Sequence, residues 1–319
     1  MNDVVLAIYS DRLFMAAVGV YVLAMVLHAA EYATLRAARP SVAAAAPVAV
    51  GAPAGVPAGD ASAAAAPDDR PARGRADRFG GAAVNLVVLG VVLQLGSIVC
   101  RGLATDRWPL GNMYEFTSAV CLAAVVTWLV VLRRVPALRA VALFVLLPVV
   151  VLLFLAGTVL YARAAPVVPA LRSYWLVVHV TTITVSSGLL LVPGVASLLY
   201  LLRRSGRGGA FVERLPSAAA LDRLAYRTTI VAFPLYTFGV IAGAIWAEAA
   251  WGRFWGWDPK ETVAFVAWVV YAAYLHARAT AGWRSGRAAW INVAGLAVVL
   301  FNLFFINMVV AGLHSYAGI

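Results

Sequence analysis

Eight apolar runs, each long enough to cross a lipid bilayer, divide this sequence of 319 residues. A transmembrane helix needs about 20 apolar residues, and such runs recur at 12–34, 80–100, 114–132, 140–160, 176–202, 229–249, 262–281 and 290–312. Only 12% of the residues are charged, against about a quarter in soluble domains. Open sheet edges cannot be satisfied in hydrocarbon. The fold is therefore predicted to be all-α, a polytopic integral membrane protein with eight transmembrane helices.

Three regions are expected along the chain. Residues 1–36 form the first transmembrane helix, without the small-residue cleavage site of a signal peptide. Residues 37–78 are rich in alanine and proline and have no apolar period, which predicts a disordered cytoplasmic linker. Residues 79–319 carry the other seven helices and form the core.

The 25 basic residues are distributed unevenly over the connections. Eighteen of them fall in alternate connections, at 36–78, 133–139, 203–227 and 278–287. Connections rich in basic residues face the cytoplasm, so both termini are expected to be extracytoplasmic, in a multi-pass protein of the plasma membrane. The formal net charge of +11 is accordingly interpreted as a topology signal, and no nucleic-acid partner is expected.

The four histidines of the chain form two pairs at different expected depths. At 1.5 Å per residue, His28 and His276 lie about 25 and 22 Å from the outer ends of their helices, toward the cytoplasmic side. His179 and His314 lie at the outer ends of the fifth and eighth helices. Neutral imidazoles from separate helices suit the two axial positions of haem iron. The pattern predicts a haem-iron site at each level.

A single histidine of this kind also has a plainer explanation, as a polar group bonded to a nearby carbonyl or hydroxyl. Polar groups inside a bilayer are expensive and usually functional, and two same-depth pairs favour metal ligands. Zinc is disfavoured because it needs a third or fourth ligand, and no cluster in the sequence supplies one.

The connection between the sixth and seventh runs, residues 251–262, reads WGRFWGWDPKET. It holds three tryptophans, Trp251, Trp255 and Trp257. They are explained either as an interfacial anchor or as a flat shelf for a planar ligand. Gly252 and Gly256 favour the shelf, because they would let such a ligand approach the backbone.

Polar residues in this loop have two expected uses. Asp258 or Thr262 could cap the following helix, with Glu261 offsetting its dipole. Arg253 or Lys260 would lie near the propionates of a porphyrin that contacts the aromatic rings.

The string WGRFWGWDPKET resembles the signature WGxxWxWDxKE of the haem-handling WWD superfamily at every defining position. The loop at 108–116 and the Ser173-Tyr174-Trp175 approach to His179 are similar to the CcsA branch of system II cytochrome c biogenesis, often labelled CcsB or ResC in actinobacteria. Eight spans with this loop between the sixth and seventh resemble CcsA more than the shorter CcmC or the longer CcmF type. The resemblance is strong over 80–319, weak over the first helix and absent from the linker.

This resemblance implies a haem transporter and cytochrome c synthase (haem lyase) subunit carrying non-covalent haem b in transit. Haem would enter at His28 and His276 and move to His179 and His314, where the loop would cover it. An apocytochrome c CxxCH segment would then add its thiols to the vinyl groups, in chemistry that belongs to cofactor and substrate. The implied haem-contacting residues are His28, His179, His276, His314, Trp251, Gly252, Trp255, Gly256, Trp257, Asp258, Lys260 and Glu261.

The implied partners are a ResB-type membrane subunit, apocytochrome c and a thioredoxin-like thiol reductant. A separate reductant is expected because the two cysteines of the chain, Cys100 and Cys121, form no CxxC pair. No general acid or base is assigned. Glu115, Asp258 and Glu261 are expected only in supporting roles.

Two other functions compete with this one. A membrane electron carrier with two b-type haems would place two histidines on each of two helices, whereas no run here holds two. A permease would have repeats or broken helices around a midplane site. Pro193-Gly194 and Pro234 could kink helices, but no repeat is evident.

Overall fold

The computed structural model describes residues 2–37, 70–166, 173–280, 283 and 286–314. Within these ranges the secondary structure is helical and contains no strand. The elements, in order, are α1 (Asn2–Ala37), α2 (Arg70–Thr105), α3 (Met113–Arg134), the 3₁₀ turn η1 (Pro136–Val141), α4 (Ala142–Thr158), α5 (Tyr174–Ser205), α6 (Gly209–Glu213), α7 (Ala218–Trp251), α8 (Pro259–Ala279), α9 (Gly286–Phe301), the π-helical turn η3 (Asn302–Ile306) and α10 (Asn307–Val309).

Eight helical segments of the described chain are long and apolar enough to cross a membrane, one for each predicted run. The prediction of an all-α, polytopic membrane protein is therefore confirmed. Capping side chains define several of the helix starts. Asn112 accepts a hydrogen bond from the Glu115 N–H at the start of α3, and Ser217 accepts one from the Ala220 N–H at the start of α7.

The first helix matches the predicted range 1–36 and continues past the outer end of its apolar run, whereas the second helix is longer than predicted. α1 already includes Asp11 and Arg12, because Asp11 is paired with Arg101 of α2 at 3.4 Å and with the Tyr161 hydroxyl at 2.7 Å. α2 begins at Arg70, inside the segment 37–78 predicted as a linker, and Asp77 there accepts a hydrogen bond from Arg139. The linker prediction is wrong for residues 70–78, and residues 38–69 lie outside the described chain.

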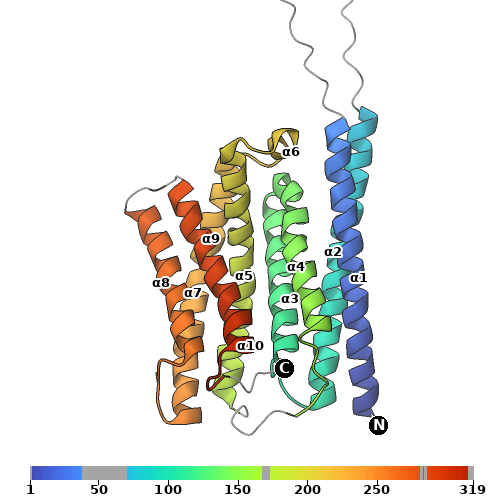
Figure 1. Cartoon of the computed structure of the whole chain (residues 1–319). Helices are drawn as coiled ribbons and strands as arrows, with labels where there is room; N and C mark the ends of the chain where they lie inside the picture. The colour runs from blue at the N-terminus through green and yellow to red at the C-terminus, as the bar shows by residue number, and fades with distance from the viewer. Residues whose placement is uncertain (1, 38–69, 167–172, 281–282, 284–285, 315–319) are drawn as a thin grey trace, which may run out of the picture.

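α5 runs through the middle of the bundle. In Figure 1, α1 and α2 form one edge and α8 the opposite edge. Of the apolar window of α5, 72% is buried, against 28% for α1 and 17% for α8. One apolar core joins α5 to α1–α4, and a second joins it to α7, α8 and α9. A residue on α5 therefore lies in the part of the molecule where a site can be enclosed on several sides.

The bundle has two distinguishable ends. The α7–α8 connection, residues 252–258, lies at the end where α1 begins, which is called here the tryptophan-rich end. The turn at 135–139 and the segment 203–214 lie at the opposite, arginine-rich end (Figure 1). The candidate site described next is at the tryptophan-rich end.

Candidate functional site

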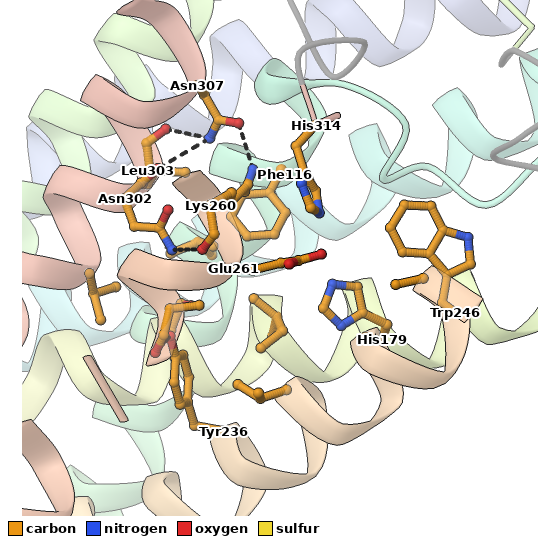
Figure 2. A pocket seen from close by; sticks show the side chains of 18 of the residues that line it. Phe116, His179, Tyr236, Trp246, Lys260, Glu261, Asn302, Leu303, Asn307 and His314 are labelled. Atoms are coloured by element: carbon orange, nitrogen blue, oxygen red, sulfur yellow. Dashed lines mark hydrogen bonds between the residues drawn. The ribbon is translucent and has the colours of Figure 1, made fainter. Parts of the chain in front are cut away.

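A cavity with about 990 Å³ of empty space opens among α5, α7, α8 and the last helix. Its lining is mainly apolar and aromatic, and it includes both His179 and His314 (Figure 2). The structure therefore brings together the two histidines that were predicted as the outer pair.

His179 is held in one orientation by α7. Its Nδ1 lies 2.7 Å from the carbonyl oxygen of Gly239, and its ring stacks on Trp246 at 10° with a centroid distance of 6.0 Å. A carbonyl can only accept, so Nδ1 carries the proton and Nε2 keeps its lone pair. Gly243 leaves room for this ring, because a Cβ there would lie 2.6 Å from Nδ1.

His314 is held by the α7–α8 loop. Its Nδ1 lies 2.9 Å from Oδ1 of Asp258, and the N–H of Leu313 donates to Oδ2 of the same carboxylate at 2.7 Å. The carboxylate is an acceptor, so Nδ1 again carries the proton and Nε2 the lone pair. Carboxylate and carbonyl partners of this kind fix the ring orientation of metal-binding histidines.

Asp258 has a second task, as the N-cap of α8. Its side chain accepts from the Lys260 N–H at 3.1 Å, while Glu261 accepts from the Asp258 N–H in a capping box. Burial alone would raise the pKa of Asp258, but the hydrogen bonds from His314 and Leu313 outweigh it and lower the pKa to about 2. One ionised carboxylate thus joins the start of α8 to the turn that follows α10.

The three tryptophans of the loop have different positions. Trp251 and Trp255 line the cavity, and the Trp251 ring lies 5.1 Å from that of His314. Trp257 is 66% exposed and does not line the cavity; it contacts Trp255 and Phe265. Its φ of 57° is in the left-handed region, which is rare for a bulky residue. Trp251 and Trp255 therefore remain candidates for a surface that contacts a planar ligand, whereas Trp257 lies outside the cavity.

The two loop glycines do not open the backbone to a ligand in the expected way. Gly252 ends α7 with a φ of 71° and donates its N–H to Glu248, which is the ordinary role of a helix-terminating glycine. At Gly256 a Cβ would lie 0.8 Å from Nη1 of Arg253, so the guanidinium occupies that space. Arg253 fills the gap and lies 3.9 Å from Glu261.

One end of the cavity is polar. The Lys260 ammonium donates to Oδ1 of Asn307 at 2.5 Å, and the π-helical turn at 302–306 places Asn302 in the lining as well. π-Helical turns are frequent at functional sites. Oε1 of Glu261 and Oδ1 of Asn302 are buried acceptors with no hydrogen-bond donor among the described residues.

Sequence reasoning missed Trp246, Gly243 and the two asparagines. Trp246 lies five residues before the signature and is buried between His179 and Trp251. The available signal for Asn302 and Asn307 was two amides within an otherwise apolar final span. Nothing in the sequence marked Gly243, whose role depends on which helix packs against it.

The other predicted pair is not brought together. His28 lies on α1 beside Glu31 and Arg139, in a separate cavity at the arginine-rich end. His276 is an exposed residue of α8, on the opposite edge of the bundle (Figure 1). This arrangement gives no inner haem site between His28 and His276, and it equally weakens the alternative of a two-haem electron carrier.

Glu115 is held in a network of hydrogen bonds that stabilises the 108–116 loop. Its carboxylate accepts from Arg101 at 2.9 Å and from Arg107 at 2.7 and 2.8 Å, and from the Gly111 N–H. The nearby Trp108 indole donates to Thr181, two residues after His179. The 108–116 loop therefore supports the end of α5 that carries His179.

Comparisons with known proteins point in one direction. Residues 110–314 match the family model described as cytochrome C assembly protein. The chain is 38% identical over 258 residues to the cytochrome c biogenesis protein CcsA of Parasynechococcus marenigrum, covering 72% of this chain and 85% of that protein. It is 37% identical over 262 residues to CcsA of Prochlorococcus marinus (strain MIT 9303), covering 72% and 82%.

Proposed function

Because this chain belongs to the CcsA family of system II cytochrome c biogenesis proteins, we propose that it holds haem between His179 and His314 for attachment to apocytochrome c. Its role in cytochrome c biogenesis follows from the family. The proposed part is the presentation of haem at the tryptophan-rich end, which we infer to be the extracytoplasmic side of the plasma membrane from the arginine distribution.

The proposal rests mainly on one observation: His179 and His314 hold their rings in the same tautomer and line the same cavity. Both line one aromatic cavity, and both have Nδ1 bound to an acceptor, so that Nε2 is the nitrogen with the lone pair. Bis-imidazole ligation of haem iron requires that tautomer at both positions. The aromatic lining of the cavity suits a flat macrocycle.

The polar end of the cavity suits a haem propionate and the backbone of the apocytochrome segment. Lys260 has three N–H donors and uses one for Asn307, so the others are available to a propionate. The lone acceptors on Glu261 and Asn302 would accept N–H groups from an apocytochrome CxxCH segment. When bound, haem supplies the vinyl groups that receive the cysteine thiols, while this chain binds and orients.

Partners complete the proposal. Cys121 is buried and Cys100 is a separate, half-buried residue, so the substrate thiols would be kept reduced by a thioredoxin-like protein. A ResB-type membrane subunit is the expected partner in the synthase. His28 on α1 and His276 on α8 lie on opposite edges of the bundle, so haem entry between these two residues is not part of the proposed function.

The test is haem content and cytochrome c maturation of the chain purified with its ResB-type partner. His179→Ala and His314→Ala should each lose the bis-histidine spectrum and holocytochrome, and added imidazole should restore part of both by replacing the ligand. His28→Gln is the matched control and should retain both. Wild-type haem content and maturation in both alanine variants would falsify the ligand assignment.

A further inference from the structure

A second cavity, with about 810 Å³ of empty space, lies at the arginine-rich end. Its walls come from α1, from the turn η1 and from Arg214, the residue that follows α6. The polar lining residues are His28, Glu31, Tyr32, Arg139 and Arg214. This His28 cavity shares no lining residue with the haem site proposed above.

One ring nitrogen of His28, Nε2, has no hydrogen-bond partner among the described residues. Its side chain is 2% exposed, and its Nδ1 lies 3.1 Å from Oε2 of Glu31. The carboxylate accepts, so Nδ1 carries the proton, and in the neutral imidazole Nε2 is then an acceptor. Nε2 is buried and has no hydrogen-bond partner in the described chain. A buried acceptor without a hydrogen-bond donor is unfavourable, so Nε2 of His28 favours a ligand that brings an O–H or N–H donor.

Among the described residues, the charges around His28 leave one cation, Arg214, without a counter-ion. Glu31 is shared between His28 and Arg139, and Arg139 also pairs with Asp77 at 2.8 Å. Arg214 lies with its guanidinium 5.7 Å from the ring centre of Tyr32. Its Nε is buried, and within the described ranges Arg214 has neither an ion pair nor a hydrogen bond from that nitrogen. The cavity therefore lacks an oxyanion beside Arg214.

The depth of the cavity matches the level of lipid headgroups. The apolar span of α1 has 32 residues, which is about 48 Å of helix against about 30 Å of hydrocarbon. Divided equally between the two ends of α1, the excess of about 18 Å would carry its last turns, which begin near His28, into the headgroup layer. Basic pockets between transmembrane helices at this level are typical sites for anionic headgroups.

We propose that the His28 cavity binds a phosphate that also bears a hydroxyl group. The phosphate oxygens would accept from Arg214, in a charge-assisted contact, and the hydroxyl would donate to Nε2 of His28. A phosphatidylglycerol headgroup carries both groups, and so does the inorganic phosphate monoanion. The depth of the cavity favours phosphatidylglycerol as the source. Either ligand would give a hydrogen-bond partner to both Nε2 of His28 and Nε of Arg214.

The test uses the full chain with its partner, reconstituted in nanodiscs of phosphatidylcholine, of phosphatidylcholine with phosphatidylglycerol, or of phosphatidylcholine with added inorganic phosphate. Retained lipid is counted by native mass spectrometry, and the unfolding midpoint is measured in each. Wild type should prefer phosphatidylglycerol and unfold at a higher temperature with it. Arg214→Gln should reduce that preference about tenfold, as expected for one arginine–phosphate contact, and His28→Leu should reduce it to a smaller extent.

Arg207→Gln is the control, since it removes the same charge from an exposed position at the same end. It should keep the wild-type preference. A rise in the midpoint with inorganic phosphate alone, lost in Arg214→Gln, would support the site with a soluble ligand. Equal behaviour of Arg214→Gln and Arg207→Gln would overturn the proposal, and so would a haem absorption band lost only in His28→Leu. Unfolding midpoints in pure phosphatidylcholine separate a folding defect, which lowers them, from loss of the ligand, which does not.

Discussion

His314 donates a hydrogen bond from its Nδ1–H to Oδ1 of Asp258 across 2.9 Å, and so ties the turn that follows α10 to the residue that precedes α8. The two residues are 56 positions apart in sequence. The Asp258 carboxylate accepts hydrogen bonds from three groups, the His314 ring and the backbone N–H groups of Leu313 and Lys260. Loop order and histidine orientation therefore depend on one carboxylate.

The ionisation of Asp258 sets the pH range of this contact. Its pKa is lowered from 3.8 to about 2, so the carboxylate contributes stability that is fully present above about pH 4 and is lost as the pH falls toward 2. Tryptophan emission of the wild type should change in that window, and the corresponding part of the change should be missing in Asp258→Asn. Asp222→Asn, which alters the ion pair with Arg278 at the other end, is the control. A loop transition centred above pH 5 would contradict the assignment.

Gly243 offers a test of the His179 geometry without touching the ligand. A Cβ at Gly243 would lie 2.6 Å from both Cε1 and Nδ1 of His179, so Gly243→Ala must displace the imidazole or its helix, at about 1–3 kcal/mol. Gly19→Ala is the matched control, because nothing lies within 4 Å of a Cβ there. Gly243→Ala should deplete haem and lower holocytochrome yield at normal membrane abundance. Equal haem in the two variants would show that the cavity tolerates a moved ring.

The sequence alone predicted the parts of this molecule that depend on one helix at a time. Apolar run length identified all eight spans, and helix ends next to a tryptophan-rich loop identified His179 and His314 as neighbours. It failed where lateral position matters. Depth along the membrane normal placed His28 and His276 at one level, but α1 and α8 lie on opposite edges of the bundle.

Side-chain packing accounts for the other differences. A glycine pattern cannot tell a ligand surface from a space filled by a neighbour, and at Gly256 the neighbour is Arg253. The first apolar run begins at residue 12, but the helix continues back through Asp11, whose charge is balanced by Arg101 on α2. Trp246 and Gly243 act through α5–α7 packing, which no local pattern encodes.

Arg101 is predicted to be essential for assembly and not for haem. Its side chain is 2% exposed, pairs with Glu115 at 2.9 Å and Asp11 at 3.4 Å, and lies over the Tyr114 ring. Removing one partner of a buried ion pair destabilises by about 3–5 kcal/mol, so Arg101→Met should lower the unfolding midpoint and membrane abundance together. Arg12→Met, at an exposed position on α1, should change stability by less than about 0.5 kcal/mol. Normal abundance of Arg101→Met with loss of haem alone would argue for a direct role.

The loop tryptophans can be separated by position. Trp251 and Trp255 line the cavity and Trp257 does not, so Trp251→Ala and Trp255→Ala should deplete haem and stop maturation while the protein stays inserted and abundant. Each lost ring contact removes on the order of 1 kcal/mol beyond simple burial. Trp257→Ala should retain haem. If abundance falls in step with function in all three variants, the tryptophans act as an interfacial anchor.

Trp257 also permits a test of backbone strain. Its φ of 57° disfavours any residue with a Cβ by about 1–2 kcal/mol, a penalty that glycine avoids. Trp257→Gly and Trp257→Ala lose the same ring contacts with Trp255 and Phe265, so their difference reports the backbone alone. Trp257→Gly should be the more stable of the two by about 1 kcal/mol, measured as unfolding midpoints in detergent. Equal stability, or a more stable alanine variant, would mean that the loop relaxes out of the left-handed conformation once the ring is gone.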